Sequence, residues 1–220
     1  MISNIFTQIV LVVGRKEANN NISMLGTCFI IEGGKYIVTP RHVVGDNDKN
    51  LVILTPNVNK FNEYQDTTIN ECTFCNVNII ASDPFRDIAI LKLNDTVICP
   101  EISLGDTDEL NIMDELYIVG FPHCTEGRRV LTIQRADLGA KVLLESNNIK
   151  SKNIVINTQT RPGQSGSLIY DVRRNKIVAM LLGAFSPQSG ISLGGINPRE
   201  LHQTTHCISA EYILNMIKEK

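Results

Sequence analysis

Short apolar runs separated by polar, Gly-, Asn- and Pro-containing stretches dominate the hydrophobic pattern of this 220-residue chain. The runs are rich in Val, Ile and Leu, and almost no helical periodicity lies between them. Such runs predict β-strands, and many short strands together predict an all-β barrel or sandwich. The predicted strands are Ile9–Val13, Cys28–Ile31, Tyr36–Thr39, Leu51–Leu54, Ile88–Leu93, Leu116–Val119, Ile154–Ile156 and Ile177–Leu182.

The C-terminus departs from this pattern. Ile213, Met216 and Ile217 recur at three- and four-residue spacing, which indicates one buried stripe of a helix. Ser209 is of a residue type that caps helix N-termini, so we expect a helix over 210–220 that begins at this serine. The helix is predicted to dock on the rest of the domain.

A polar stretch near the middle, Gly105–Asp114, divides the chain into two strand-rich halves. We therefore expect one domain of two similar packed barrels, with an N-terminal barrel over 1–104 and a C-terminal barrel over 115–208, followed by the helix over 209–220.

Composition and charge narrow the function classes. The chain carries 43% hydrophobic and 20% charged residues, and its net charge is −2 from 21 basic and 23 acidic side chains. No long run of one sign occurs, which argues against a nucleic-acid partner. The apolar segment Met1–Val13 has its basic residues, Arg15 and Lys16, after it and is too short to span a membrane, so we expect neither a signal peptide nor a membrane anchor.

The cysteines suggest a reducing compartment. Six of them occur without the regular spacing of a disulfide framework, at positions 28, 72, 75, 99, 124 and 207. We therefore expect free thiols and a cytoplasmic location. Cys72 and Cys75 form a CxxC pair, but a zinc site normally needs a second pair, and no metal is predicted.

A Gly/Ser turn provides the first candidate for chemistry. Gly163-Gln164-Ser165-Gly166-Ser167 follows one apolar run and precedes another that begins at Leu168. Glycines on both sides of a serine permit a tight bend that exposes the hydroxyl while successive N–H groups converge, the arrangement that a nucleophile with an oxyanion hole needs. An ordinary Gly/Ser turn has the same composition, so this motif alone leaves both interpretations open.

Two further residues complete the candidate site. His42 follows the strand Tyr36–Thr39 where the chain turns, and Asp87 stands at the start of the apolar strand Ile88–Leu93. Asp is disfavoured in strands and costly to bury without a partner, so Asp87 needs one, such as an imidazole N–H. His42, Asp87 and Ser165 occur in an order known for serine proteases.

With these three segments in place, the whole chain resembles the trypsin-like clan of serine proteases. Within the clan it is most similar to the bacterial heat-shock and periplasmic quality-control proteases and to the glutamyl endopeptidases. The matching stretches span about residues 22 to 185. They are Gly26–Ile31, Ile37–Val44, Asp83–Lys92, Leu104–Asp106, Val119–Pro122 and Arg161–Ser167.

The resemblance implies a fold of two packed six-stranded antiparallel β-barrels with a C-terminal helix, and a serine endopeptidase that acts on protein or peptide substrates without a cofactor. It implies that Ser165 is the nucleophile, that His42 is the general base and that Asp87 orients His42. The N–H groups of Gly163 and Ser165 would hold the oxyanion, and Gln164 would contribute only its backbone.

Substrate-binding positions also follow from the resemblance. Gln159 and Thr160 would line the primary specificity pocket, and neither carries a charge that would select Arg or Lys. The strand Val178–Gly183, which continues to Ala184 and Phe185, would pair with an extended substrate, so that Gly183 and Ala184 would bind it through backbone bonds.

The chain departs from its relatives at several places. Gln164 replaces the aspartate by which secreted digestive enzymes hold a newly cut N-terminus, and Val43 replaces the cysteine that follows their catalytic histidine. We therefore expect no zymogen activation of that type and a reducing compartment. No PDZ domain follows, which predicts a bare protease domain, and a regulatory partner or a homo-oligomer stays open.

Two other readings remain. One is a protease fold locked in an inactive state that serves as a sensor or binding module. The other is a metal protein, whose candidate ligands would be Cys72, Cys75, His202, His206 and Cys207.

Overall fold

The computed structural model describes residues 3–19, 21–94, 97–185 and 204–218. Twelve strands and three α-helices lie in this part of the chain, with two short 3-10 turns. In chain order they are α1 Ser3–Ile9, β1 Val10–Lys16, β2 Ile22–Ile31, η1 Glu32–Gly34, β3 Tyr36–Pro40, α2 Arg41–Val44, β4 Leu51–Leu54, β5 Phe74–Asp83, β6 Ile88–Leu93, β7 Glu115–Gly120, η2 Cys124–Glu126, β8 Thr132–Ser146, β9 Ile149–Ile156, β10 Leu168–Asp171, β11 Lys176–Phe185, β12 Thr204–Ser209 and α3 Glu211–Lys218.

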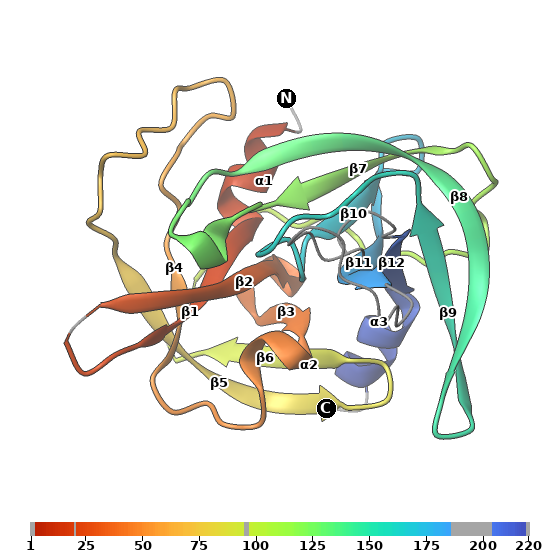
Figure 1. The fold of residues 1–220 in the computed structure, drawn as a ribbon, viewed down its shortest axis with the longest axis horizontal. Coiled ribbons are helices and arrows are strands. Elements are labelled where there is room, and N and C mark those ends of the chain that lie inside the picture. Colours follow the sequence, from red (N-terminus) through yellow and green to blue (C-terminus); the bar gives the residue numbers. More distant parts are fainter. Residues whose placement is uncertain (1–2, 20, 95–96, 186–203, 219–220) are drawn as a thin grey trace, which may run out of the picture.

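The strands form two closed antiparallel barrels of six strands each, which Figure 1 shows side by side. The first has the order β1-β2-β3-β6-β5-β4 and the second β10-β11-β12-β9-β8-β7. The all-β, two-barrel prediction with a C-terminal helix is confirmed. The connection 94–114 joins the barrels, and the predicted joint Gly105–Asp114 falls within it.

All eight predicted strands are present, and four others were missing from the prediction or undefined in it. β5 and β8 mix apolar with polar residues and are partly exposed along much of their length, so their apolar residues form only short runs. β12 reads Thr-Thr-His-Cys-Ile-Ser, in which apolar residues are few. β10 is the apolar run that begins at Leu168. These strands form because neighbouring strands supply ladder partners, which a pattern along one segment does not reveal.

One buried cluster continues from the first barrel into the second. α1 contributes to it at the junction, where the Phe6 ring meets the Tyr170 ring of β10 edge to face, with 5.2 Å between the centroids. The apolar N-terminal segment therefore forms α1 and part of the first barrel strand, β1. This contact packs α1 against the second barrel.

The C-terminal helix packs against the domain as predicted, but its start differs. α3 begins at Glu211, its Ile213 is fully buried, and the guanidinium of Arg86 lies 4.5 Å from the Tyr212 ring centroid. Ser209 belongs to β12, and its buried hydroxyl has no hydrogen-bond partner among the described residues. The predicted cap at Ser209 is therefore wrong, because strand pairing extends up to this residue.

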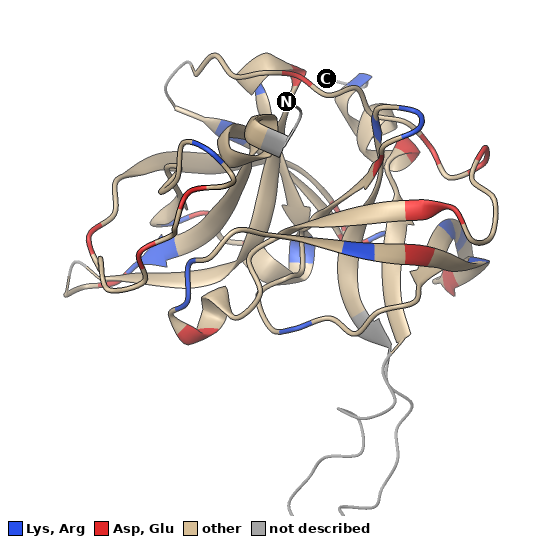
Figure 2. Ribbon diagram, turned by 90° about the horizontal axis from the view of Figure 1, so that it is seen from above, with Lys and Arg blue, Asp and Glu red and all other residues tan. Residues whose placement is uncertain are grey.

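Charged residues of both signs are spread over both barrels. Figure 2 shows Lys and Arg positions interspersed with Asp and Glu positions along the ribbon. Among the described residues, no helix is long and apolar enough to cross a membrane.

Candidate active site

The register of β3 against β6 places the histidine beside the aspartate. Pro40, the last residue of β3, lies opposite Ile88, the first residue of β6. The chain therefore leaves β3 into the one-turn helix α2 next to the turn that precedes β6. His42 and Asp87, which occupy these two positions, meet at one end of the first barrel.

Asp87 contacts His42 at two points. Its Oδ1 accepts the His42 backbone N–H at 2.8 Å, and its Oδ2 lies 2.5 Å from His42 Nδ1. The Asp87 carbonyl also accepts the N–H of Arg41 at 3.1 Å. Asp87 has a φ of +57°, a left-handed conformation that is uncommon for a residue with a side chain and more accessible to Asp and Asn than to most. Its contacts to α2 hold this conformation and fix the carboxylate against the imidazole.

The turn around Ser165 requires its two flanking glycines. Gly163 and Gly166 have φ values of +87° and +92°. A Cβ on Gly163 would come within 2.7 Å of Cys124 Sγ, and one on Gly166 within 1.9 Å of the Thr27 carbonyl oxygen. Both the backbone conformation and the close approach of other segments therefore exclude side chains here.

Gln164 closes this turn with its side chain. The residue is 1% exposed, and its Oε1 accepts the Arg161 N–H at 2.7 Å, while its own N–H donates to the Arg161 carbonyl at 3.1 Å. The prediction that Gln164 contributes only its backbone is wrong. A buried side-chain amide needs a hydrogen-bond partner, and the fold of the turn brings the Arg161 N–H within reach of this one.

The carbonyl groups of the turn are directed to protein donors. The Pro162 carbonyl accepts the His123 N–H at 2.6 Å, and the Gln164 carbonyl accepts the Ser167 N–H at 2.9 Å. In a trans peptide the N–H of the next residue points away from the carbonyl oxygen. The bonds to the Pro162 and Gln164 carbonyls therefore set the directions of the Gly163 and Ser165 N–H groups. Neither N–H has a backbone acceptor among the described residues. Two free donors of this kind can bind an oxyanion.

The Ser165 backbone lies beside the residue that follows His42. A Cβ on Gly26 would be 2.9 Å from Val43 Cγ1 and 3.1 Å from the Ser165 carbonyl oxygen, so one small residue separates the two segments. The Ser165 hydroxyl donates to the Leu182 carbonyl at 2.9 Å, and no hydrogen bond to His42 is recorded. The side chain of His42 is 49% exposed, which leaves the imidazole open to the junction of the barrels.

The predicted substrate-binding residues lie around the turn. Thr160 is 8% exposed and Gln159 is exposed, each a few residues before Ser165. A Cβ on Gly183 would lie 3.8 Å from Ser165 Oγ, so β11 passes next to the hydroxyl. Ala184 follows Gly183 in β11 and pairs with Thr205. Substrate binding by these four residues stays a prediction.

Several residues at the site were not found from the sequence. The Leu182 carbonyl accepts the Ser165 hydroxyl, the His123 N–H holds the Pro162 carbonyl, and Thr27 bonds the turn from the other barrel. Main-chain groups leave no residue-type signal. Thr27 lies within the matching stretch Gly26–Ile31, but its role depends on contacts between segments far apart in the chain.

All six cysteines are unpaired. Cys28, Cys124 and Cys207 are buried, and Cys72, Cys75 and Cys99 are partly exposed. Burial raises the pKa of Cys124 to about 12 and raises the pKa values of Cys28 and Cys207 strongly. Because the thiolate is the reactive form, these three thiols are protected by both inaccessibility and protonation.

We expect Ellman's reagent at pH 8 to modify Cys72, Cys75 and Cys99 in the folded protein and all six cysteines only after denaturation. Dithiothreitol should leave stability and the thiol count unchanged, since no disulfide is available to reduce. Thiol titration before and after reduction measures both. A loss of folding on reduction would contradict this assignment.

The metal reading has no support in the described residues, where no group of three or more His, Cys, Asp or Glu side chains could hold an ion. His202, one of its proposed ligands, lies outside the described residues.

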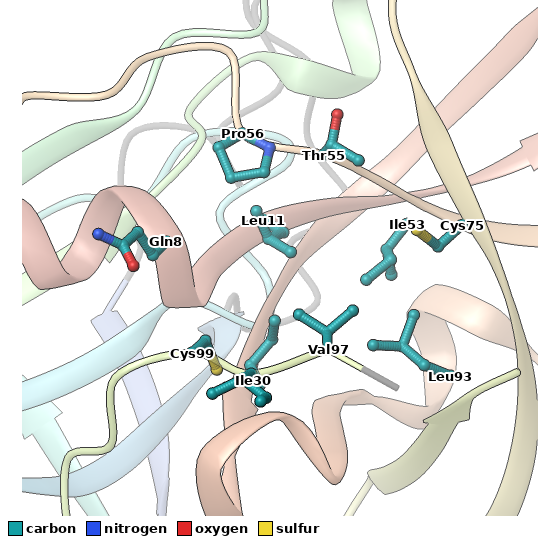
Figure 3. Close-up of a pocket in the computed structure, with 11 residues that line it drawn as sticks. Gln8, Leu11, Ile30, Ile53, Thr55, Pro56, Cys75, Leu93, Val97 and Cys99 are labelled. Atoms are coloured by element: carbon teal, nitrogen blue, oxygen red, sulfur yellow. The ribbon is translucent and has the colours of Figure 1, made fainter. Parts of the chain in front are cut away.

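Residues of the first barrel and its neighbouring segments line a cavity of about 210 Å³ (Figure 3). Its lining is mostly apolar and comes from α1, several strands of the barrel and the segment around Val97. His42, Asp87 and Ser165 do not line it. His42 and Asp87 lie at one end of the first barrel, and Ser165 lies on the turn that precedes β10.

Comparison with known proteins identifies the family of this domain. The family model described as "Trypsin-like peptidase domain" matches residues 26–180. A probable periplasmic serine endoprotease, DegP-like, from Bartonella henselae is 26% identical over 165 residues, which are 75% of this chain and 29% of the relative. The corresponding protein of Rickettsia conorii is 25% identical over 163 residues, with coverages of 74% and 29%. The chain thus spans under a third of the length of these relatives.

Solved structures show the same fold. The HtrA-type protease AlgW with decapeptide superposes with a TM-score of 0.69 at 17% identity, covering 99% of this chain and 66% of that one. The MamO protease domain from Magnetospirillum magneticum superposes with a TM-score of 0.68 at 12% identity, covering 96% of both chains. At these identities the two structures support the fold alone.

The predicted cytoplasmic location is wrong by this comparison, because the curated relatives are described as probable periplasmic serine endoproteases. The prediction depended on unpaired cysteines and on Val43 in place of a cysteine. Free cysteines do not identify a compartment when they are buried in the barrels or lack a partner at the geometry that a disulfide requires.

Proposed function

The chain belongs to the family of trypsin-like peptidase domains, and from this premise we propose that it is a serine endopeptidase with Ser165, His42 and Asp87 as its catalytic triad. The observation that carries the proposal is the His42–Asp87 pair, bonded through Nδ1 and the backbone N–H, beside a serine turn with two free N–H donors. Acyl transfer needs a base, a nucleophile and an anion site in this arrangement.

The proposed reaction begins with attack of Ser165 Oγ on the carbonyl carbon of a peptide bond. His42 Nε2 accepts the hydroxyl proton as the C–O bond forms, and the carbonyl electron pair moves to the oxygen. The N–H groups of Gly163 and Ser165 stabilise this oxyanion. Collapse of the intermediate breaks the C–N bond, and the amine leaves with the proton from His42. Water then hydrolyses the acyl ester by the same steps.

In this proposal the Ser165 hydroxyl exchanges acceptors. Its bond to the Leu182 carbonyl must be replaced by a bond to His42, which rotation about the Cα–Cβ bond of Ser165 accomplishes. Asp87 accepts a hydrogen bond from the Nδ1–H group, which keeps the proton on Nδ1 and leaves Nε2 free to act as the base. This role agrees with the contact of Asp87 Oδ2 to His42 Nδ1.

We further propose that substrates are extended peptides of periplasmic proteins. β11 runs past Ser165 at Gly183, where a substrate strand can pair with its backbone. The relatives that share this domain are periplasmic endoproteases, which supports the same compartment for this chain.

A fluorophosphonate probe tests the proposal directly. We expect stoichiometric labelling of the folded protein at Ser165, identified by peptide mass mapping, because only an activated serine with an oxyanion site reacts at a useful rate. Casein or a peptide library should be cleaved in parallel. If the folded protein is neither labelled nor able to cleave these substrates, the locked sensor or binding module is favoured instead.

A further inference from the structure

Thr27 joins the first barrel to the serine turn of the second. It lies on β2, is fully buried and bonds the turn at two places. Its N–H donates to the Ser165 carbonyl at 2.9 Å, and its hydroxyl donates to the Gly163 carbonyl at 2.9 Å. The two carbonyls therefore flank the Gln164–Ser165 peptide, whose N–H is one donor of the proposed oxyanion site, and the Gly163 carbonyl belongs to the residue that carries the other donor.

The same hydroxyl also accepts a bond. The N–H of Phe121, just after β7, donates to Thr27 Oγ1 at 3.0 Å. Two residues later the His123 N–H holds the Pro162 carbonyl at 2.6 Å, and His123 has a φ of +63°. The Thr27 hydroxyl therefore connects the segment that orients the Gly163 N–H to the turn that contains it.

These contacts need a small hydroxyl at position 27. The hydroxyl acts both as donor and as acceptor. A methyl group in its place would leave the Phe121 N–H without this acceptor and the Gly163 carbonyl without this donor. A Cβ on the neighbouring Gly120 would lie 3.2 Å from Thr27 Oγ1 and 1.8 Å from Ser167 Oγ, so little space remains for a larger group.

We propose that Thr27 is a positioning residue for the oxyanion site: its hydroxyl ties the Gly163 carbonyl to the 121–123 segment, whose His123 N–H holds the Pro162–Gly163 peptide, and so keeps the Gly163 N–H directed at the reacting carbonyl. This inference rests on the proposed peptidase function. Without the hydroxyl, the turn keeps its Ser165 contact but loses the bond that links it to the segment holding Pro162. The barrel itself is built by strand pairing, which the hydroxyl does not enter.

The experiment compares Thr27→Val, which preserves the shape of the side chain but removes the hydroxyl, with Thr27→Ser, which keeps it. Thr7→Val is the matched control. Thr7 is 1% exposed, and its hydroxyl donates to the Asn4 and Asn59 carbonyls at 2.9 and 3.2 Å, neither of which belongs to the serine turn. For each variant we would measure the melting temperature, kcat, KM and the affinity for a peptide boronic acid, whose tetrahedral adduct with serine uses the oxyanion site.

Loss of one oxyanion donor costs about 10²–10³ in kcat, so misorientation of one donor in Thr27→Val should lower kcat by about tenfold or more. The boronate affinity should fall by a similar factor, while KM stays within about threefold. Thr27→Ser should restore kcat to within about threefold of wild type. Thr7→Val should lower the melting temperature without changing kcat.

Three outcomes would overturn the proposal: a folded Thr27→Val protein with wild-type kcat, a loss confined to KM, or a folded Thr27→Ser protein that is as slow as Thr27→Val. If Thr27→Val does not fold, Thr27→Ala is measured against the same criteria, and Thr27→Ser must still retain kcat. A wild-type protein without hydrolysis or fluorophosphonate labelling would refute the peptidase function and this inference together. An active wild type beside an unimpaired Thr27→Val refutes only the inference.

Discussion

Ser165→Ala should abolish peptide hydrolysis in a protein that remains folded. Removal of the nucleophile in a serine protease lowers kcat on the order of 10⁶-fold, because no other group at the site can form the acyl intermediate. The cost to stability should be small. The hydroxyl makes one hydrogen bond, to the Leu182 carbonyl, and a bond of this kind contributes about 1 kcal/mol. Initial rates with a fluorogenic peptide, together with thermal unfolding, measure both effects.

Ser209→Ala is the control for the loss of a serine hydroxyl from the second barrel. Ser209 is fully buried on β12, and its hydroxyl has no partner among the described residues. Its removal should leave kcat unchanged and stability equal or slightly higher, since an unpaired buried hydroxyl is costly. Peptide cleavage by purified Ser165→Ala at more than a thousandth of the wild-type rate would refute the proposed nucleophile.

Asp87→Asn should lower kcat by about 10⁴, the loss that the same substitution causes in a related protease. An asparagine amide can donate to His42 Nδ1, which then carries no proton, so Nε2 becomes protonated and cannot accept the Ser165 proton. Asparagine suits the test because it tolerates the φ of +57° at this position, so the backbone of the turn is retained. Single-turnover rates of acylation should show the loss without a comparable change in KM.

Asp46→Asn provides the matched control near the same helix. Asp46 forms an ion pair with Arg41 at 2.5 Å, and its side chain is 72% exposed. Exposed ion pairs contribute little, so both activity and stability should stay close to wild type. Equal losses in Asp46→Asn and Asp87→Asn would show that charge near α2, rather than the His42–Asp87 contact, controls the rate.

The sequence by itself determined the fold class and the position of the catalytic candidates. The apolar runs identified eight of the strands, because strands buried on both faces leave continuous Val, Ile and Leu segments. The turn at Gly163 and Gly166 could also be predicted from the sequence. Their positive φ values and close contacts require glycine, so the local requirement appears directly as a residue type.

The tertiary structure alone decided what each of these residues contacts. The register of β3 against β6 brings His42 to Asp87, and barrel packing brings Thr27 to the serine turn across more than a hundred residues of chain. The main-chain groups that matter here, the Leu182 and Pro162 carbonyls and the His123 N–H, are common to nearly all residue types and leave no trace in a sequence. β5, β8 and β12 likewise depend on ladder partners from distant segments, because a strand with few apolar residues, or with one face exposed, gains most of its stability from its neighbours.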